Sequence, residues 1–566
     1  MVGNTRYGVM TPADEKILEC LKGRKSFLLD AGAGSGKTSS LIRALDHIRG
    51  PERKALLRDG QHVACITFTN VAKNEILERT DHDPLFKVTT IHDFLWDAVQ
   101  SFQKELRESL IVFNSELPTR SRRRVDEADL ALAIKDKPTI SYSDRGANFL
   151  EGRIYHDDLL GVAEVMFRSH PMLAKIVAAR YPFIFVDEYQ DTHEMVISIL
   201  MDHLIKVKAP PLIGFFGDKV QSIYPDGVGE LSADHQAALV AIKKEENYRC
   251  SKTVIDVLNK IRDDIKQVPS GNNVKGAAVY VSLTGTTPEA DITQAALNKA
   301  KADLGIEIDG ELKVLFLTHR LIARKAGYEA LWNAYNERGG FAKDSFQAGD
   351  DPIASFLIKK VDMVIEAWRA GKVGRAISLL NDRKKPFASR DEKAKVKDAL
   401  DELLKLADNG SSICDVLRHI EKTGLLPLLD DFHLALAGKF ESAEEGSSAA
   451  KHQTLVETLM DIPYQEISIY RAVLQSNLPY STKHGVKGDQ FKNVLVILDD
   501  TGANWSQYSF GNLLEGTDSS NSRLQRSRNL FYVCCSRAQD TLIVANLGHS
   551  DKTKLDALFG VGSVST

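Results

Sequence analysis

The amino-acid sequence predicts an α/β protein, in which short buried strands alternate with helices. Short runs rich in β-branched and aromatic residues are bounded by glycine, proline or acidic residues, which is typical of strands buried in a parallel sheet. These runs are residues 63–67, 183–186, 212–216, 314–317, 494–498 and 542–545. Helical patterns lie between them, and this alternation predicts layers of helices packed on a sheet.

Two long stretches break the alternation. Residues 95–175 and 345–475 have helical periodicity and few strand patterns, so both are predicted to be mainly helical insertions. Within the second stretch, one apolar helix face is followed by a stop signal at Asn409-Gly410. The members of that face are Val396, Leu400, Leu403, Leu404 and Ala407.

Composition and charge exclude several classes of protein. Hydrophobic residues are 43% and charged residues 27% of the 566, and no apolar run reaches the length of a membrane span. The N-terminal residues 1–16 contain no hydrophobic signal segment, so a soluble cytoplasmic protein without a membrane partner is predicted. The formal net charge is −4, so any nucleic acid must bind in a local cleft.

Two local features are interpreted as structural. The basic run 120–124 could touch phosphates, but a short charge run is more often a solvated face. Six cysteines without paired metal-ligand spacing are typical of a reducing compartment. The adjacent Cys534 and Cys535 lie in an apolar stretch and are predicted to be packing residues.

A glycine-rich string follows the apolar run 27–29 and precedes a helical pattern from Ser39. It consists of Ala31, Gly32, Ala33, Gly34, Ser35, Gly36, Lys37 and Thr38, with Ala31 in place of the usual first glycine. Glycines let backbone N–H groups converge on a phosphate, Lys37 places positive charge between the β- and γ-phosphates, and the Thr38 hydroxyl can ligate Mg²⁺. The string predicts a nucleoside triphosphate site.

Acidic residues after the strand 183–186 complete the predicted site. Asp187 can hold Mg²⁺ through its water shell, and Glu188 can orient and deprotonate the attacking water. The carboxyl end of a strand is where an α/β sheet places its ligands. An acidic pair alone is often a solvated loop, but with the phosphate-binding string it predicts hydrolysis of a nucleoside triphosphate.

Two arginines far apart in the chain, Arg249 and Arg537, are candidates for contacts with the γ-phosphate. With further strings in the same order, they resemble the UvrD, Rep and PcrA group of superfamily-one DNA helicases over nearly the whole chain. The strings are Thr67-Phe68-Thr69-Asn70, Thr90-Ile91-His92, Asp187-Glu188-Tyr189-Gln190-Asp191-Thr192, Gly217-Asp218, Gln221-Ser222-Ile223-Tyr224, Asn247-Tyr248-Arg249, Thr482 with His484, Lys487-Gly488 with Phe491, and Phe531-Tyr532-Val533 with Ser536-Arg537-Ala538.

This resemblance implies two RecA-like P-loop domains, each carrying a mainly helical insertion, with ATP and Mg²⁺ bound between them. The first domain would comprise 1–94 and 176–245 with its insertion at 95–175. The second would comprise 246–344 and 476–566 with its insertion at 345–475.

The resemblance also assigns roles to individual residues. It implies catalytic roles for Lys37, Glu188, Gln221, Arg249 and Arg537, and Mg²⁺ ligation by Thr38 and Asp187. It implies nucleotide contacts from the string 31–38 and from Ser39, Tyr248 and Gln490. Single-stranded or partly duplex DNA would contact Thr67, Phe68, Asn70, His92 and His484, with a base stacked on Phe68.

Departures from the family pattern bear on mechanism. The glutamine that reads adenine is absent from 11–16, and the arginine after the loop is Ser39, so base selectivity would rest on stacking by Tyr248. The tryptophan and arginine expected after Tyr224 are replaced by the string 225–229, Pro-Asp-Gly-Val-Gly, which removes a stacking platform and adds negative charge. The glutamate that touches the ribose is Gln490, which still forms hydrogen bonds but carries no charge.

The short insertions and the variant strings 487–491 and 530–537 resemble the compact UvrD-like subunits that pair with an OLD-type nuclease in Gabija antiphage defence. Three functions stay open. The chain is a 3′–5′ single-stranded DNA translocase or helicase, a DNA-stimulated ATPase that senses DNA ends or gaps and regulates a partner nuclease, or a P-loop switch without nucleic acid. The motif setting of Phe68, His92 and His484 disfavours the third.

Overall fold

The computed structural model describes residues 10–119, 121, 123–135, 137, 139–143, 147–223, 226–283, 292–316, 319–380, 389–440, 444, 446–475, 480–482, 489–499, 508–547 and 553–560. The chain divides into two compact units. Unit 1 comprises Met1–Tyr280, Asn504–Leu542 and Ser550–Ser565. Unit 2 comprises Val281–Ala503, Ile543–His549 and Thr566.

A six-stranded sheet forms the centre of unit 1, in the order β3-β2-β6-β7-β1-β8. Every pairing in it is parallel. Its strands are β1 Phe27–Ala31, β2 Val63–Thr67, β3 Phe86–Thr90, β6 Phe183–Asp187, β7 Leu212–Gly217 and β8 Val240–Lys244. Because all strands run the same way, their carboxyl ends meet at one edge of the sheet.

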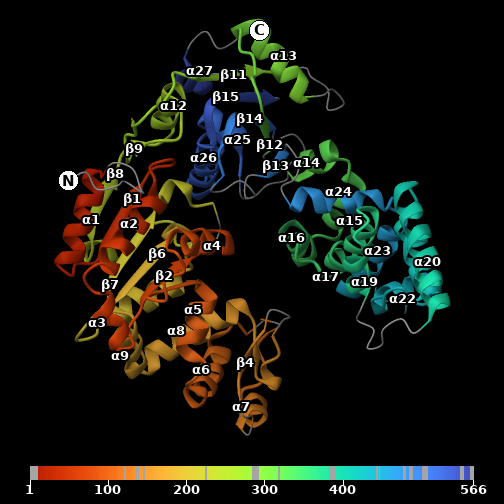
Figure 1. Cartoon of the computed structure of the whole chain (residues 1–566), viewed down its shortest axis with the longest axis horizontal. Coiled ribbons are helices and arrows are strands. Elements are labelled where there is room, and N and C mark those ends of the chain that lie inside the picture. Colours follow the sequence, from red (N-terminus) through yellow and green to blue (C-terminus); the bar gives the residue numbers. More distant parts are fainter. Residues whose placement is uncertain are drawn as a thin grey trace. The chain divides into compact units, whose positions relative to one another are not determined.

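Helices cover both faces of this sheet, as the near-continuous apolar strands require (Figure 1). Alternate strand residues point to opposite faces, so Phe183 and Phe185 join one core while Ile184 and Val186 join the other. The first core includes α1 Pro12–Lys22 and α2 Lys37–Arg49. The second includes α5 Ile91–Val99, α8 His156–Ser169 and α9 Pro171–Arg180.

Between β3 and β6 the chain is mainly helical. Helix α8 packs against both α5 and α6, and α7 packs on α6. The further elements here are α6 Gln103–Glu116, α7 Glu127–Lys135, β4 Ser141–Tyr142, η1 Phe149–Glu151 and β5 Arg153–Ile154.

Unit 1 contains further helices and two short strands. They are α3 Arg53–Arg58, α4 Asn70–Arg79, η2 Tyr189–Asp191, α10 Glu194–Ser198, η3 Ile199–Leu204, η4 Lys219–Gln221, α11 Ala233–Ala237, β9 Glu246–Asn247, α12 Lys252–Ile261, β10 Val268–Pro269, α25 Phe510–Glu515, α26 Asn521–Cys535 and α27 Thr553–Phe559.

A second sheet has the order β11-β15-β14-β12-β13, and β12 pairs in parallel with both β13 and β14. Its strands are β11 Ala277–Ser282, β12 Leu312–Phe316, β13 Tyr480–Thr482, β14 Phe491–Asp499 and β15 Ala538–Leu547. Strands β11 and β15 pass from unit 1 into unit 2, because the division falls at Tyr280 and at Leu542.

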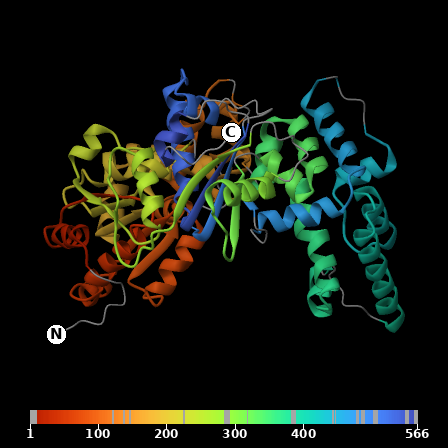
Figure 2. The same ribbon diagram turned by 90° about the horizontal axis from the view of Figure 1, so that it is seen from above.

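Unit 2 is otherwise helical, and its helices α15 to α24 gather into one body in both views (Figures 1 and 2). The helices are α13 Ile292–Leu304, α14 His319–Ala326, α15 Glu329–Arg338, α16 Gly340–Ala348, α17 Pro352–Phe356, η5 Leu357–Asp362, α18 Met363–Arg369, α19 Val373–Leu380, α20 Arg390–Asp408, α21 Ile413–Thr423, α22 Asp430–Ala437, α23 Ser448–Met460 and α24 Gln465–Leu474.

The structure confirms the predicted α/β class and every predicted strand, with β12, β14 and β15 beginning earlier than expected. The predicted helix in the second helical stretch is α20, which buries Leu400, Leu403 and Ala407 and is capped at Asn409. Of the strands in the two larger sheets, β3, β8, β11 and β13 were not predicted. In β3 and β8, Lys87 and a lysine pair interrupt the apolar runs.

The basic run 120–124 and the adjacent Cys534 and Cys535 have structural roles in the described residues. Of the basic run, Arg123 pairs with Asp157 and Asp158, and Arg124 pairs with Glu127. Cys534 and Cys535 are fully buried within α26, as packing residues are. Among the residues that the structure describes, no helix is long and apolar enough to cross a membrane.

Tight packing at the centre of the first sheet generates a stability prediction. A Cβ added at Gly214 would lie 2.6 Å from Phe27 and 2.7 Å from Phe185, inside a cluster of packed rings. We expect Gly214→Ala to lower the free energy of unfolding by about 1–3 kcal/mol through overpacking. Urea denaturation followed by circular dichroism measures this loss. Gly50→Ala is the matched control, because its added Cβ meets nothing closer than 3.7 Å; equal losses in both variants would contradict the prediction.

Candidate active site

The carboxyl edge of the six-stranded sheet carries three of the predicted motifs side by side. The glycine-rich string follows β1, the acidic residues follow β6, and Asp218 follows β7. Strand β7 lies between β6 and β1, with Asp187 opposite Phe216 and Asp30 opposite Gly217. Sheet topology therefore brings together motifs that are far apart in sequence.

The glycine-rich loop has the geometry of a phosphate cradle. Gly34 and Gly36 have φ angles of 73° and 80°, a left-handed conformation that favours glycine. Helix α2 begins directly after the loop, at Lys37, and no described side chain caps its first amides. The Ser35 hydroxyl is buried and has no hydrogen-bond partner in the described part of the chain. Uncapped amides, a lysine and an unpaired buried hydroxyl fit a phosphate group.

Lys37 and Glu188 face each other across this loop. The Lys37 ammonium lies 2.7 Å from Glu188 Oε2, and the same oxygen accepts a hydrogen bond of 2.6 Å from the Gln190 amide. Burial lowers the pKa of Lys37, but the negative charges of Glu188, Asp218 and Asp187 outweigh it and raise the pKa above its usual value. Lys37 is therefore held as a cation in the site.

Glu188 has an unusual backbone conformation. Its φ angle is 52°, in the left-handed region that non-glycine residues rarely adopt. Strain of this kind concentrates at functional sites, where the surrounding structure holds the residue in place. Here the conformation turns the chain sharply after β6 and directs the Glu188 side chain towards Lys37.

Asp187 ends β6 and accepts a hydrogen bond of 3.1 Å from the backbone N–H of Glu188. Burial and the neighbouring Glu188 carboxylate raise the pKa of Asp187 to about 7. A carboxylate in such surroundings favours a cation beside it. In the ranges given above, no group of three or more His, Cys, Asp or Glu side chains could hold a metal ion. Mg²⁺ at Asp187 and Thr38 would take its other ligands from water and phosphate oxygens.

The other predicted catalytic residues, Gln221, Arg249 and Arg537, are connected by hydrogen bonds that include Ser536. Arg537 donates to Gln221 Oε1 at 3.3 Å and to the Ser536 hydroxyl at 3.0 Å. Arg249 donates to the Ser536 carbonyl at 3.3 Å. Burial and the neighbouring positive charge of Arg249 lower the pKa of Arg537 to about 10, so it stays charged at neutral pH. The structure places both arginines beside one another in unit 1.

Tyr248 lies against the phosphate loop. Its backbone N–H donates to the Gly34 carbonyl at 2.9 Å, and 47% of its surface is exposed. Asp14 occupies the segment from which the adenine-reading glutamine is absent. Its carboxylate accepts hydrogen bonds from Ser40 at 2.6 Å and from the Thr11 N–H at 3.0 Å.

Two cations also contact the Asp14 carboxylate, since Arg43 pairs with it and the Lys244 ammonium lies 3.5 Å away. Burial raises the pKa of Asp14, but the Ser40 hydrogen bond and the charge of Lys244 outweigh it and lower the pKa. The carboxylate oxygens of this α1 residue are thus engaged by the N-cap Thr11, by α2 and by β8. We infer that Asp14 joins these elements and does not read a base.

Four of the predicted DNA-binding residues lie at the ends of two neighbouring strands or shortly after them. Thr67 and Thr90 are opposite each other at the ends of β2 and β3. Phe68 follows β2 and is 37% exposed, Asn70 begins α4 and is exposed, and His92 is the second residue of α5. The structure thus groups these side chains at the same sheet edge as the phosphate loop.

His92 is half-buried and packs against His156, with ring centroids 4.7 Å apart. Burial and His156 lower the pKa of His92 to about 4, so its imidazole is neutral at pH 7. It can therefore contact a strand by hydrogen bonding or stacking, but adds no positive charge. Thr67 is fully buried, and its hydroxyl, which has a single proton to donate, lies 3.2 Å from the Thr69 carbonyl and 3.4 Å from the Thr89 carbonyl.

Two predicted residues are not placed in this site. Gln490 precedes β14 and belongs to unit 2, and His484 lies outside the described residues. Two other residues were missed from the sequence. Arg262 contacts Asp218 at 3.2 Å, and Tyr532 contacts the backbone of Ala33 at 3.1 Å. An arginine at the end of the amphipathic α12 was the available signal for the first, and no sequence pattern indicates the contact of the second.

The fold and this site are those of a P-loop nucleotide-binding domain, and the similarity to known proteins supports a helicase-like ATPase. Residues 14–226 match the family model of the AAA domain. The chain is similar to the Gabija protein GajB of Bacillus cereus, with 25% identity over 93% of this chain and 94% of that protein. It is also similar to the ATP-dependent DNA helicase Rep of Escherichia coli, with 26% identity over 44% of this chain and 42% of Rep. The ATP-dependent DNA helicase PcrA of Staphylococcus aureus is 25% identical over 43% of this chain and 39% of PcrA.

The surroundings of Tyr248 and Asp14 predict weak base selectivity. Stacking accepts any base, whereas strong discrimination needs buried polar groups that a wrong base leaves unpaired. We expect GTP to support turnover within about tenfold of ATP, a gap of about 1.4 kcal/mol. Steady-state kinetics with each nucleotide measures the ratio. Tyr248→Ala should raise KM for both nucleotides while Tyr248→Phe behaves as wild type, and strict dependence on ATP would refute the prediction.

Proposed function

We propose that this chain is an ATP-dependent translocase on single-stranded DNA of the UvrD type. The main support for this proposal is that the phosphate loop and the group of Phe68, Asn70 and His92 lie at the same edge of the sheet. Strand β2, which ends at the group, is hydrogen-bonded to β6, which ends at the acidic pair. A change at the nucleotide therefore reaches the candidate DNA surface through adjacent strands. The 3′–5′ direction is implied by the resemblance to UvrD, Rep and PcrA alone.

The side chains around the loop support a hydrolytic mechanism. Bound ATP with Mg²⁺ would supply the phosphorus centre and part of the charge that stabilises its transition state. Thr38 and Asp187 would hold the metal. Lys37, now paired with Glu188, would exchange this partner for phosphate oxygens, which leaves the Glu188 carboxylate to accept a proton from water. Gln190 would keep Glu188 oriented through its 2.6 Å hydrogen bond.

Arg249 and Arg537 are proposed to act together on the γ-phosphate, with Gln221 hydrogen-bonded to both Arg537 and Asp218. Their shared contact with Ser536 supports a common role. Arginine contacts of this type are generally worth about 10³–10⁵ in turnover. Tyr248 would stack on the base, and Ser39 and Gln490 are proposed as further nucleotide contacts.

We further propose two RecA-like domains, 1–94 with 176–245 and 246–344 with 476–566, carrying insertions at 95–175 and 345–475. The mainly helical elements between β3 and β6 and from α15 to α24 support these boundaries. Thr67, Phe68, Asn70, His92 and His484 are the proposed DNA contacts. A cytoplasmic role in antiphage defence with an OLD-type nuclease partner is supported by the similarity to the Gabija protein GajB over 93% of the chain.

A second function is favoured by the segment after Tyr224. Gly227 bridges to His193, and the Val228 and Gly229 amides donate to the carbonyls of Thr192 and Gln190 at 2.8 and 2.9 Å. The segment thus runs along the acidic motif, and its Asp226 is exposed. This arrangement, with an exposed acidic residue where the family has a tryptophan and an arginine, favours a second function. The chain would then be a DNA-stimulated ATPase that senses DNA ends or gaps and regulates a nuclease without unwinding.

A strand-displacement assay combined with ATPase measurements separates these functions. The substrate is a duplex with a 3′ single-stranded tail, and a 5′-tailed duplex is the control for direction. Displacement from the 3′ tail with DNA-stimulated hydrolysis supports the translocase. Stimulation without displacement supports the sensor, and hydrolysis that ignores DNA would contradict both.

The Lys37–Glu188 pair predicts two different phenotypes. Glu188→Gln removes only the base, so we expect hydrolysis to fall by about 10²–10⁴ while ATP and DNA binding persist. Lys37→Ala should impair nucleotide binding and turnover together. Fluorescent-nucleotide titration and a phosphate-release assay measure the two effects. Wild-type turnover in Glu188→Gln would show that another residue is the base.

The adjacent arginines predict non-additive losses. Arg249→Ala and Arg537→Ala should each remove most turnover, and the double variant should be little worse than either single one. Arg537 is buried, so Arg537→Lys provides a variant that keeps the charge and loses the guanidinium fork. Phosphate release at saturating DNA is the measurement, with melting temperatures as a control for folding. Additive losses would argue against a shared γ-phosphate contact.

A further inference from the structure

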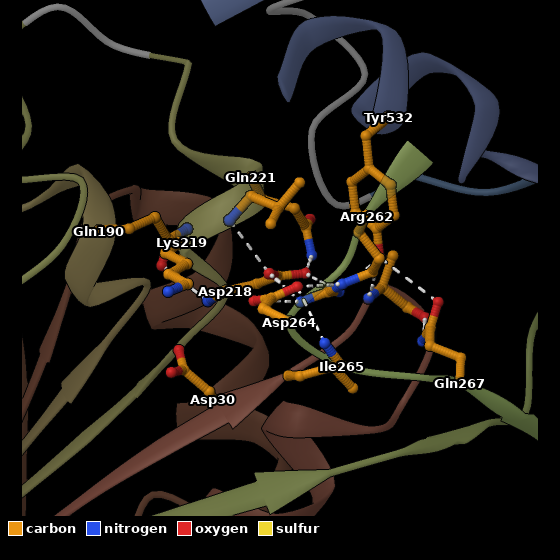
Figure 3. A network of polar contacts seen from close by, with 12 residues as sticks. Asp30, Gln190, Asp218, Lys219, Gln221, Arg262, Asp264, Ile265, Gln267 and Tyr532 are labelled. Atoms are coloured by element: carbon orange, nitrogen blue, oxygen red, sulfur yellow. Dashed lines mark hydrogen bonds and ion pairs between the residues drawn. The ribbon is translucent and has the colours of Figure 1, made fainter. Parts of the chain in front are cut away.

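A buried arginine joins two carboxylates behind the phosphate loop. Arg262 directly follows α12 and is 3% exposed. Its guanidinium lies 3.2 Å from Asp218 and 2.9 Å from Asp264, and donates to the Tyr532 hydroxyl at 2.8 Å (Figure 3). Burial lowers the pKa of Arg262, but the Asp218 charge and other contacts outweigh it, so the pKa is raised. The proposed mechanism does not use this arginine.

The Tyr532 hydroxyl connects Arg262 to the phosphate loop through hydrogen bonds. It accepts a hydrogen bond of 3.1 Å from the backbone N–H of Ala33 and donates one of 3.3 Å to Gln267 Oε1. The Gln267 amide in turn donates to the Ala33 carbonyl at 2.8 Å. Both backbone polar groups of Ala33 are therefore held by side chains from outside the loop. The Tyr532 hydroxyl uses its single proton and both acceptor positions.

The same network reaches the residues proposed to contact the γ-phosphate. Asp218 Oδ2 accepts a hydrogen bond of 2.8 Å from the Gln221 amide, and Gln221 Oε1 accepts one of 3.3 Å from Arg537. Tyr532 lies in α26, and Arg537 follows the end of that helix. The helix thus carries both the group that fixes the loop and one of the proposed arginine contacts.

We propose that Arg262 and Tyr532 are positioning residues that hold the phosphate loop in register with Gln221 and Arg537, so that the site favours a nucleoside triphosphate over a diphosphate. The inference rests on the proposed nucleotide site. Loss of the Tyr532 hydroxyl leaves the Ala33 N–H without that acceptor, and the loop is then free to shift relative to α26. Contacts with a γ-phosphate suffer most from such a shift, because they need the loop and α26 together.

Nucleotide binding to the full-length protein tests this inference. We expect Tyr532→Phe to weaken binding of a non-hydrolysable ATP analogue at least about fivefold more than binding of ADP. Calorimetric titration with Mg²⁺ and without DNA gives both affinities. Tyr280→Phe is the matched control, since Tyr280 is also buried and donates to Asp556 at 2.6 Å, away from the loop. The control should lose comparable thermal stability and keep the wild-type ratio of affinities.

Arg262→Lys keeps the charge, but a lysine cannot contact Asp218, Asp264 and Tyr532 at once. We therefore expect this variant, like Tyr532→Phe, to lose more affinity for the ATP analogue than for ADP. The double variant with Tyr532→Phe should be little worse than either single one, because both act through one network. An unchanged ratio in Tyr532→Phe would overturn the inference. A wild-type protein that binds both nucleotides equally would do so too.

These outcomes are distinct from failure of the proposed function. DNA-stimulated hydrolysis by the wild-type protein with an unchanged ratio in Tyr532→Phe would remove the positioning role alone. The opposite result is a Tyr532→Phe variant with a reduced preference for the ATP analogue over ADP and a wild-type protein whose hydrolysis DNA does not stimulate. That result would support the positioning role and contradict the translocase.

Discussion

The parallel alignment of six strands is the constraint on which the site depends. Parallel strands need long connections, so their carboxyl ends belong to segments far apart in sequence. Residues 31–38, 187–190 and 218–221 meet only because β1, β6 and β7 are neighbours. The two cores on either side hold this sheet through alternate residues of each strand. Any shift of one strand by one residue would exchange its two faces and displace the motif that follows it.

Buried positive charge behind the loop is the second organising feature. Arg262 and Arg537 are both almost fully buried, and each would be costly without partners. Arg262 is paired with two carboxylates, and Arg537 donates to the Val533 carbonyl and to the Ser536 and Gln221 oxygens. Both guanidinium groups therefore have hydrogen-bond acceptors in the protein interior, as buried charges require.

The fold class, most strands and the phosphate site could be predicted from sequence because each depends on local chemistry. Glycines at 34 and 36 with the lysine after them form one local string, and the acidic residues at the end of β6 form another. The role of Tyr532 could not be predicted, because its partner Ala33 is separated from it by nearly the whole chain. The structural role of Asp14 could not be predicted for a related reason, since only the structure shows that Lys244 and Arg43 surround it. The roles proposed for individual site residues stay predictions.

The left-handed backbone at Glu188 has a consequence for how this protein responds to selection. A non-glycine residue in that conformation costs about 1–2 kcal/mol, which glycine at the same position would recover. Selection for heat resistance alone would therefore favour loss of the side chain that the proposed chemistry needs most. At this position a gain in stability costs activity. Variants selected only for thermal stability are therefore expected to include inactive proteins with glycine at position 188, unless catalysis is selected at the same time.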